Sequence, residues 1–455
     1  MTTFREQLMK NTEFYKKLFA IAIPITLQQL IISSLNLIDT FMISSLTKEA
    51  IAGVGAANKV FFLLNLFLFG MSSGSSILTA QFWGKKDVEN IKKVYGLSLT
   101  FALGGGLLFT IVAILLPQQV MSIFSTDAQV IIEGANYLRI VGFSYLFTAV
   151  TFSTMFVLRS TNYVKLPLFV TMVAISVNTF LNWILIYGNM GFQPMGVEGA
   201  AIATLIARTL ECFMLVGLSN YYKLPPSGKL KTLFSYNKSL AKHFSKIAMP
   251  VVINEILWST GVTMYAIVYG RMGTDAMAAM TITQTIEQII FVVSVGVGNA
   301  SAVMLGNSLG AMEGDKIYDE AVQFVKINFL LGAFMGIIII LSAPHIAGIY
   351  SVPPIVKYNI IGSLSVFGMY TMVKSVNLVI IVGILRSGGD TIFAAALDGI
   401  AVWGLGVPLA ILTGLVLKWD LPYVYAAILF EEMAKFSFGI KRMKSKRWMN
   451  NLVEQ

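Results

Sequence analysis

Few acidic side chains lie inside the long apolar runs of this chain, and two of them have the character of functional groups. Asp39 lies in the first apolar run, with Asn36 one helical turn before it. Glu255 lies in the seventh run, directly after Asn254. Because a carboxylate inside a membrane helix is costly, it normally faces a cavity or a partner. We expect both acids to bind a proton or a cation, with a buried structural hydrogen bond as the alternative for each.

Neutral polar residues accompany Asp39 in the same half of the chain. Asn178 and Asn182 are one turn apart in the fifth apolar run, and Thr204 lies in the sixth. Side-chain oxygens of Asn, Thr and Asp suit a hard cation or a proton-linked network. Hydrogen bonding between helices is the alternative. Asn178, Asn182 and Thr204 are therefore candidates for a cation site or a proton-linked network.

Other acids have simpler explanations. Glu211 follows Arg208 by three residues, and Lys435 follows Glu431 by four. Both spacings place opposite charges on one helix face, so we expect structural pairs. Two acids have no local partner and stay open between function and structure: Glu287 and Asp398.

The chain lacks the signatures of several enzyme classes and metal sites. Neither a nucleotide-binding loop ending in Gly-Lys-Ser/Thr nor a His-Glu-x-x-His sequence is present. The single cysteine, Cys212, cannot form an intrachain disulfide or a cysteine-rich metal site. His243 and His345 lack a metal-binding spacing. We expect no enzymatic activity and no cofactor.

The composition indicates a membrane protein. Of 455 residues, 56% are hydrophobic and only 12% are charged, whereas a soluble protein has about a quarter charged residues. Several uncharged runs approach the length of a bilayer span, roughly 20 residues. We predict about twelve helical spans, near residues 16–44, 52–83, 94–117, 134–158, 166–188, 197–220, 245–270, 277–309, 322–344, 359–385, 392–416 and 420–439.

The net charge of +10 comes from the loops. Lys and Arg gather in every second loop and in the tail after residue 440, as the positive-inside rule predicts for cytoplasmic segments. We therefore expect a multi-pass protein of the cell (inner or plasma) membrane with both termini in the cytoplasm, and we expect no nucleic-acid partner.

Two halves of the chain repeat each other. Residues 21–24 (Ile-Ala-Ile-Pro) return as 247–250 (Ile-Ala-Met-Pro), 226 residues later, and residues 158–160 (Leu-Arg-Ser) return as 385–387. The same offset pairs Asp39 with Tyr265 and Glu255 with Gln29. Six spans per copy make the repeat parallel, an arrangement that usually brackets a central solute pathway.

The expected domains follow from the repeat. They are an amino-terminal six-helix lobe (1–222), a cytoplasmic linker (223–243), a carboxy-terminal six-helix lobe (244–440) and a basic cytoplasmic tail (441–455). Pro24 and Pro250 occupy equivalent places in the first helix of each lobe, where each should bend its helix. A packing bend and a hinge beside a cleft are both open.

Motifs along nearly the whole chain resemble those of the multidrug and toxic compound extrusion (MATE) family. They are Pro24 with Asp39, Gln81-Phe82-Trp83-Gly84, Arg159-Ser160, Gly196-Val197-Glu198-Gly199-Ala200-Ala201, Asn254-Glu255, Tyr269-Gly270-Arg271-Met272-Gly273 and Leu385-Arg386-Ser387-Gly388-Gly389-Asp390. The resemblance implies twelve helices in two lobes and efflux of organic cations in exchange for protons or sodium ions. It also implies that Asp39 and Glu255 match the family's acids on the first and seventh helices. By the same resemblance, Asn178 and Thr204 match polar residues of the cation site in the amino-terminal lobe, so Asp39, Asn178 and Thr204 are the expected ligands if the ion is sodium.

The resemblance has two departures. Some members carry an aspartate where this chain has Asn182, and some carry an acid on the tenth helix, which here has Lys374, Ser375 and Asn377 instead. The alternative function is a lipid-linked precursor flippase of the same superfamily, although few basic residues lie within the spans. We expect small organic cations and membrane lipids as partners, and a monomer.

Overall fold

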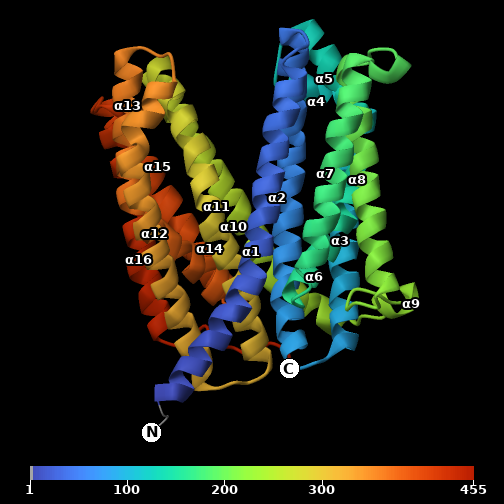
Figure 1. Ribbon diagram of the computed structural model, residues 1–455, viewed down its shortest axis with the longest axis vertical. Helices are drawn as coiled ribbons and strands as arrows, with labels where there is room; N and C mark the ends of the chain where they lie inside the picture. The colour runs from blue at the N-terminus through green and yellow to red at the C-terminus, as the bar shows by residue number, and fades with distance from the viewer. Residues whose placement is uncertain (1–3, 455) are drawn as a thin grey trace. The chain divides into compact units, whose positions relative to one another are not determined.

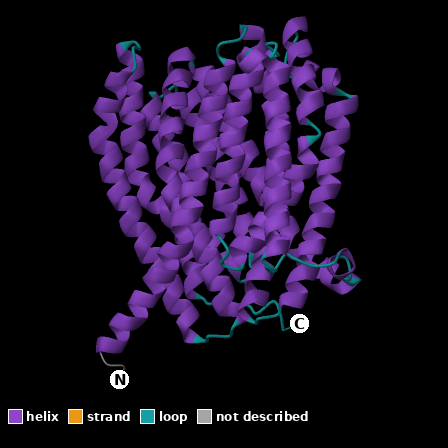
Figure 2. Ribbon diagram, turned by 45° about the vertical axis from the view of Figure 1, so that its right-hand side comes forward, coloured by secondary structure: helices purple, strands orange, loops and turns teal. Residues whose placement is uncertain are grey.

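The structure is a computed structural model that describes residues 4–454, with side chains described for all of these except 4–11, 35–37 and 40. Within that range the chain is built from helices and contains no strand (Figure 2). The all-α class expected from the apolar runs is confirmed, because a backbone that faces lipid must satisfy its hydrogen bonds internally.

The chain forms two compact units. The amino-terminal unit is Leu27–Val252, and the carboxy-terminal unit combines Met1–Thr26 with Ile253–Gln455. Each boundary divides one long helix, α1 (Phe4–Ile43) or α10 (Lys238–Met272) (Figure 1).

The two boundaries fall at equivalent prolines. One lies two residues after Pro24 and the other two residues after Pro250. A proline inside a helix removes a backbone donor and crowds the preceding turn, so the helix bends there. In both helices the proline therefore lies within two residues of the division between the units.

The amino-terminal unit continues with long helices joined by short turns. They are α2 (Lys48–Gly84), α3 (Val88–Leu115), α4 (Pro117–Ser122), α5 (Ala128–Val141), α6 (Ser144–Ser160), α7 (Lys165–Tyr187), η1 (Asn189–Gly191), α8 (Gly196–Tyr221) and α9 (Leu230–Leu233). Polar residues set several helix starts, since Thr47 and Asp127 each accept hydrogen bonds from backbone N–H groups of the first turn. Gly188 ends α7 with a left-handed conformation (φ 74°).

Small residues allow close packing around the core of this unit. Leu64, Leu68 and Tyr145 are fully buried in that core. A Cβ atom on Gly53 would lie 2.7 Å from the backbone nitrogen of Gly134, so α2 and α5 approach through their glycines. Close backbone approach of this kind is how membrane helices gain packing without a hydrophobic driving force.

The carboxy-terminal unit is less regular. Its helices are α11 (Thr274–Gly310), α12 (Asp315–Ile349), α13 (Pro354–Leu378), η2 (Val379–Leu385), α14 (Thr391–Ala401), η3 (Val402–Gly406), α15 (Val407–Ile411), η4 (Leu412–Val416) and α16 (Leu421–Lys444). The segments η2, η3 and η4 are π-helical. Pro408, which has no N–H to donate, lies between η3 and η4. Wide turns of this kind often occur near functional side chains.

Length and composition identify most of the predicted spans. Among the described residues, ten helices are long and apolar enough to cross a membrane, and the bent pair α5–α6 makes an eleventh if it counts as one span. The twelfth predicted run corresponds to α16, which carries Glu431, Glu432 and Lys435 within its length. Its charges make it less apolar than the others.

The internal repeat is visible in hydrogen bonds as well as in sequence. Arg159 donates to Gln28 Oε1 at 2.6 Å, and Arg386 donates to Glu255 Oε1 at 2.9 Å. Both pairs are 131 residues apart. The contact made by Glu255 is therefore made in the other unit by Gln28, and not by Gln29 as the sequence offset predicts.

One short sequence resembles a hydrolase motif only in its letters. Residues 70–74 are Gly-Met-Ser-Ser-Gly, which fits the nucleophile pattern Gly-x-Ser-x-Gly. That motif needs a sharp turn between a strand and a helix. Ser72 is instead buried in the middle of α2, so this segment belongs to the helix packing.

Candidate functional site

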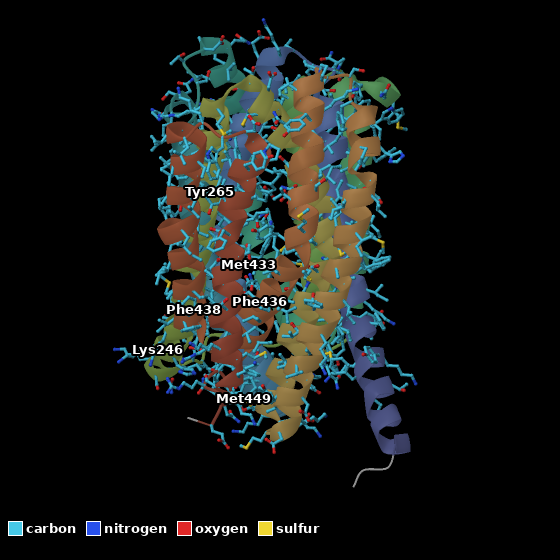
Figure 3. All side chains as sticks on the ribbon, turned by 90° about the vertical axis from the view of Figure 1, so that its left-hand side faces the viewer. Lys246, Tyr265, Met433, Phe436, Phe438 and Met449 are labelled. Carbon is cyan, nitrogen blue, oxygen red and sulfur yellow. The ribbon has the colours of Figure 1, made fainter. Side chains whose placement is uncertain are left out.

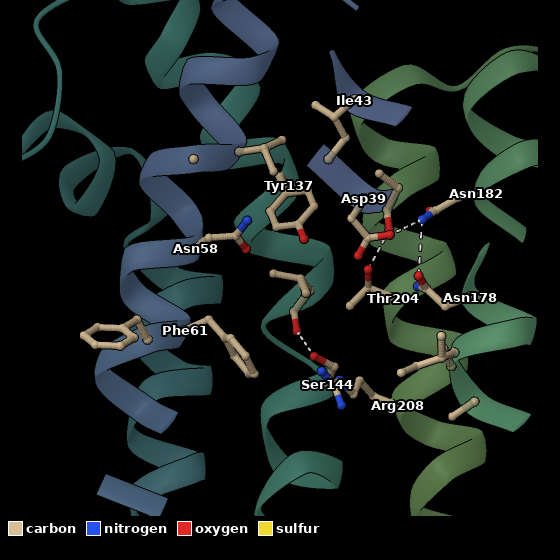
Figure 4. A pocket seen from close by; sticks show the side chains of 18 of the residues that line it. Asp39, Ile43, Asn58, Phe61, Tyr137, Ser144, Asn178, Asn182, Thr204 and Arg208 are labelled. Carbon is tan, nitrogen blue, oxygen red and sulfur yellow. Dashed lines mark hydrogen bonds between the residues drawn. The ribbon is translucent and has the colours of Figure 1, made fainter. Parts of the chain in front are cut away.

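A cavity of about 420 Å³ lies in the amino-terminal unit (Figure 4). Residues of α1, α2, α5, α6, α7 and α8 line it. Its volume falls within the range of small-molecule sites, about 300–1,000 Å³. The polar side chains of the lining are Asp39, Asn58, Asn65, Tyr137, Ser144, Asn178, Asn182, Thr204, Arg208 and Glu211.

Asp39 is held in this cavity by the two predicted asparagines of α7. Asn182 Nδ2 donates to Asp39 Oδ1 at 2.8 Å and also to Asn178 Oδ1 at 3.2 Å. Positions four apart lie on one helix face, and both asparagines are buried. The Oδ1 atom of Asn182 has no hydrogen-bond partner among the described atoms. The site therefore contains a free acceptor next to a carboxylate.

Thr204 and Tyr137 complete the surroundings of Asp39. Thr204 donates its hydroxyl proton to the carbonyl of Ala200 at 2.9 Å, which leaves its oxygen lone pairs available to the cavity. Figure 4 shows Thr204 beside Asp39 and the hydroxyl of buried Tyr137 pointing toward both. Carboxylate, amide and hydroxyl oxygens thus converge on one small volume.

A second carboxylate of the cavity is already neutralised. Glu211 is buried and forms an ion pair with Arg208, with Nη1 and Oε2 2.9 Å apart. Thr171 donates to the other oxygen of Glu211 at 3.0 Å, and Gln28 Nε2 donates to Thr171 at 2.8 Å. The expected structural pair between Arg208 and Glu211 is therefore present and continues into a buried hydrogen-bond chain.

Asp39 and Glu211 differ in whether a neighbouring cation neutralises them. Among the described side chains, no cation lies within ion-pair distance of Asp39, whereas Glu211 has its arginine. An unpaired carboxylate inside an apolar unit binds either a proton or a mobile cation, because the isolated charge is costly there. Asp39 and Glu211 therefore differ in charge compensation, although both line the same cavity.

The structure brings together four of the six residues singled out from the sequence. Asp39, Asn178, Asn182 and Thr204 line one cavity. The side chain of Asn36 lies outside the described residues. Glu255 belongs to the carboxy-terminal unit, where it pairs with Arg386.

Sequence patterns missed other lining residues for identifiable reasons. Arg208 looked locally neutralised by its neighbour on the helix, although it also follows Thr204 by one turn. Tyr137 carried no distinguishing spacing. Asn58 and Asn65 lie seven residues apart, two turns of α2, and a search for polar pairs on one face of an apolar helix finds them.

Comparison with known proteins establishes the family. The MatE family model matches residues 24–184 and again residues 250–412. The two matches begin at Pro24 and Pro250, so they reproduce the internal repeat. Because they cover more than half of the chain, the chain belongs to the MatE family, the multidrug and toxic compound extrusion transporters.

Individual relatives match this chain over most of their length, and a solved structure shares its fold. The chain is 27% identical to the probable multidrug resistance protein YoeA of Bacillus subtilis, over 80% of this chain and 78% of that protein. It is 25% identical to the probable multidrug resistance protein NorM of Thermotoga maritima, over 98% and 96%. A crystal structure of MATE in complex with MaL6 superposes with a TM-score of 0.85 at 21% identity, covering 94% of this chain and 96% of that one.

Proposed function

We propose that this protein is a secondary active transporter that exports organic, mostly cationic, compounds in exchange for protons or sodium ions by alternating access. The observation that carries this proposal is Asp39, a carboxylate without a cation partner among the described residues, in a cavity of small-molecule size. The activity is transport and includes no covalent step.

Exchange follows from competition for one negative charge. A cationic drug or a sodium ion stabilises the ionised form of Asp39, and a proton produces the neutral form. The two cannot occupy the carboxylate together, so binding of one releases the other. Each ligand then favours the conformation that it binds better, which couples drug exit to ion entry.

A proton and a sodium ion would bind Asp39 differently. A proton needs only the carboxylate and an acceptor or donor that adapts to it, such as Asn182. A sodium ion needs several oxygens, and the proposed ligands are Asp39, Asn178 and Thr204. The choice between the two ions is therefore a question for flux measurements.

The apolar part of the lining suits an organic cation. Phe61 and Phe62 line the cavity with the aliphatic side chains of Ile43, Ile51 and Val54. Aromatic faces attract cations through their quadrupole. A flat aromatic cation such as ethidium would therefore contact both the rings and the carboxylate.

The flippase alternative is less well supported by this cavity. A site for a lipid-linked phosphate needs free basic groups. Among the described lining residues the basic side chain is Arg208, and Glu211 already pairs with it. The remaining charge of the lining is negative, which favours a cationic cargo.

We also propose the orientation and setting predicted from the loops: a monomer in the cell membrane with both termini in the cytoplasm. The ten to eleven apolar helices support a multi-pass protein. The asymmetric distribution of Lys and Arg between alternate loops supports the orientation.

Ethidium transport by proteoliposomes tests the proposed function. The purified full-length chain is reconstituted, and a sodium gradient or a pH gradient is imposed separately. One gradient should drive ethidium against its own concentration gradient, and an ionophore that collapses that gradient should stop the movement. Movement that only follows the ethidium gradient would indicate a channel and contradict the proposal.

A further inference from the structure

A buried cluster of charges in the carboxy-terminal unit has no role in the site described above. Lys435 Nζ lies 2.8 Å from Asp398 Oδ1, 3.2 Å from Glu431 Oε1 and 3.4 Å from Glu432 Oε1. All four residues are less than one-tenth exposed. The sequence predicted a local pair of Glu431 with Lys435, but the structure places three carboxylates around one ammonium group.

The internal repeat relates this cluster to the Asp39 cavity. Glu431 and Lys435 follow Thr204 and Arg208 by 227 residues, and Tyr265 follows Asp39 by 226. Tyr265 donates its hydroxyl to Glu431 Oε2 at 2.6 Å. Tyr265, labelled in Figure 3, lies on α10, and Glu431 lies on α16.

The acid and the hydroxyl have therefore exchanged helices between the two units. In the amino-terminal unit the acid is on the first helix and the hydroxyl on the sixth. In the carboxy-terminal unit the hydroxyl is on the first helix of the repeat, and the acid is on the last. An acid and a hydroxyl occupy the equivalent positions in both units, although no single residue is shared.

The cluster contains more negative than positive charge. Nearby cations are already taken, since Arg386 pairs with Glu255 at 2.9 Å and Lys374 lies 3.6 Å from Glu287. Glu287 also accepts a hydrogen bond from Tyr425. With its three acids ionised, the cluster around Lys435 would carry two uncompensated negative charges. Burying such an excess is strongly unfavourable, and bound protons remove it.

Two amides beside the cluster are suited to acids in either protonation state. Asn377 Nδ2 donates to Glu432 Oε2 at 2.6 Å, and Asn254 Nδ2 donates to Asp398 Oδ2 at 3.3 Å. Both asparagines are buried, and the Oδ1 atom of each has no partner among the described atoms. A rotated amide presents Oδ1 instead of Nδ2 and accepts a proton from a neutral carboxyl group.

A π-helical segment and buried phenols lie beside the cluster. The π-helical segment η2 (Val379–Leu385) lies between Asn377 and Arg386, so it connects the amide of one contact to the cation of another. The phenols of Tyr269 and Tyr425 are buried close by. Neither supplies a positive charge that would balance the cluster.

We propose that Asp398, Glu431, Glu432 and Lys435 form a second proton-binding site, which takes up and releases protons during the transport cycle. Lys435 fixes the three acids, Tyr265 and the two amides adapt to their protonation, and Asp39 acts separately in the other unit. The role in the cycle rests on the proposed export function, but the binding of protons does not.

Infrared difference spectroscopy tests the binding of protons directly. The full-length chain carrying Asp39→Asn is held in lipid while the pH is raised, and the C=O band of protonated carboxyl groups is followed. We expect Asp398→Asn, Glu431→Gln and Glu432→Gln each to reduce this band by about one carboxyl group. Glu313→Gln, at an exposed position of the same unit, serves as the matched control. An undiminished band in all three variants would overturn the proposal.

Tyr265→Phe keeps the proposal testable if the acid variants fold poorly. It preserves the ring but removes the hydrogen bond to the ionised form of Glu431. Protons should then bind about tenfold more tightly, because a hydrogen bond to a charged group contributes roughly 1.5–3 kcal/mol. An unchanged midpoint of the infrared transition would contradict the assignment.

Transport measurements test whether the cluster takes part in the transport cycle. Glu432→Gln should slow ethidium efflux driven by a pH gradient at least tenfold, whereas Glu313→Gln should not. Normal efflux in Glu432→Gln would exclude the cluster from the cycle. If the wild-type chain transports no ethidium at all, the export function fails, but the infrared result still decides whether the protons are bound.

Discussion

The environment of Asp39 is defined by single side chains, so its contributions can be separated one residue at a time. Asn182 on α7 donates a hydrogen bond to this acid at 2.8 Å. Arg208 contributes positive charge nearby but is occupied by Glu211. The orientation of Asp39 thus depends mainly on an amide, which stabilises the ionised acid without neutralising it.

Asn182→Ala should weaken drug binding without abolishing export. The variant removes the donor to Asp39, and a hydrogen bond to a charged group is worth about 1.5–3 kcal/mol. We expect KM for ethidium to rise about tenfold while coupling persists. Asn220→Ala, an exposed position on α8 whose amide bonds only its own helix, is the matched control. An unchanged KM would remove Asn182 from the site.

The ion pair of Glu255 with Arg386 should matter for stability through charge compensation. Arg386→Gln leaves a buried carboxylate without its cation, which costs about 3–5 kcal/mol. The double variant with Glu255→Gln should recover much of the loss. Thermal unfolding in detergent measures both, with exposed Lys48→Ala as the control. A double variant no more stable than the single one would show that the pair does not act through charge.

Part of the site could be predicted from residue type and spacing, and part could not. Asp39, Asn178, Asn182 and Thr204 stood out because polar groups are rare within apolar runs. Contacts between distant segments carried no such signal. Asp398 lacked a local partner because Lys435 reaches it from another helix.

At the scale of helices, close packing depends on a few glycines. A Cβ atom on Gly96 would lie 1.9 Å from the carbonyl oxygen of Leu233, so α3 and α9 touch through backbone atoms. Gly104, on the same helix, has no atom within 4 Å of its Cβ position. The two glycines therefore share one helix, but only Gly104 has room for a side chain.

Gly96→Ala and Gly104→Ala should have opposite effects on stability. The first forces the two segments apart and should cost about 1–3 kcal/mol. The second should be neutral or stabilising by up to about 1 kcal/mol, because alanine is the better helix former. Thermal unfolding of both variants in detergent provides the comparison. Equal losses would mean that the α3–α9 contact does not limit stability.

Helix existence was predictable from hydropathy, but helix shape was not. The run at 392–416 looked like one span, and the structure divides it into α14, α15 and two π-helical segments. The run at 134–158 is bent by 52° between α5 and α6. Periodicity reports which residues avoid water, whereas bends depend on how neighbouring helices pack.

At the scale of the whole molecule, the proposed orientation in the membrane rests on loop charge. In a Cys212→Ser background, Lys231→Cys should react with an impermeant thiol reagent only after cells are opened. Lys357→Cys should react in intact cells. The positive-inside rule predicts this difference. Labelling of position 231 from outside would invert the proposed topology.

The repeat explains why one chain can hold two ionisable sites. Duplication supplies equivalent positions, and divergence has placed the acid on the first helix in one unit and on α16 in the other. The family match at residues 24–184 and 250–412 follows the same duplication. Equivalent positions were visible in the sequence, but the exchange of acid and hydroxyl emerged only from the contacts of Tyr265 with Glu431.

Ion flux driven by ethidium is the measurement that tests the central claim most directly. Wild-type, Asp39→Asn and control Asp319→Asn proteins, the last changed at an exposed site on α12, are reconstituted at equal density. Proton and sodium fluxes are recorded when ethidium is added. We predict that wild type and Asp319→Asn exchange one of these ions for ethidium, and that Asp39→Asn, whose amide cannot exchange a proton or neutralise a cation, shows no coupled flux. Coupled flux of wild-type size in folded Asp39→Asn would contradict the account.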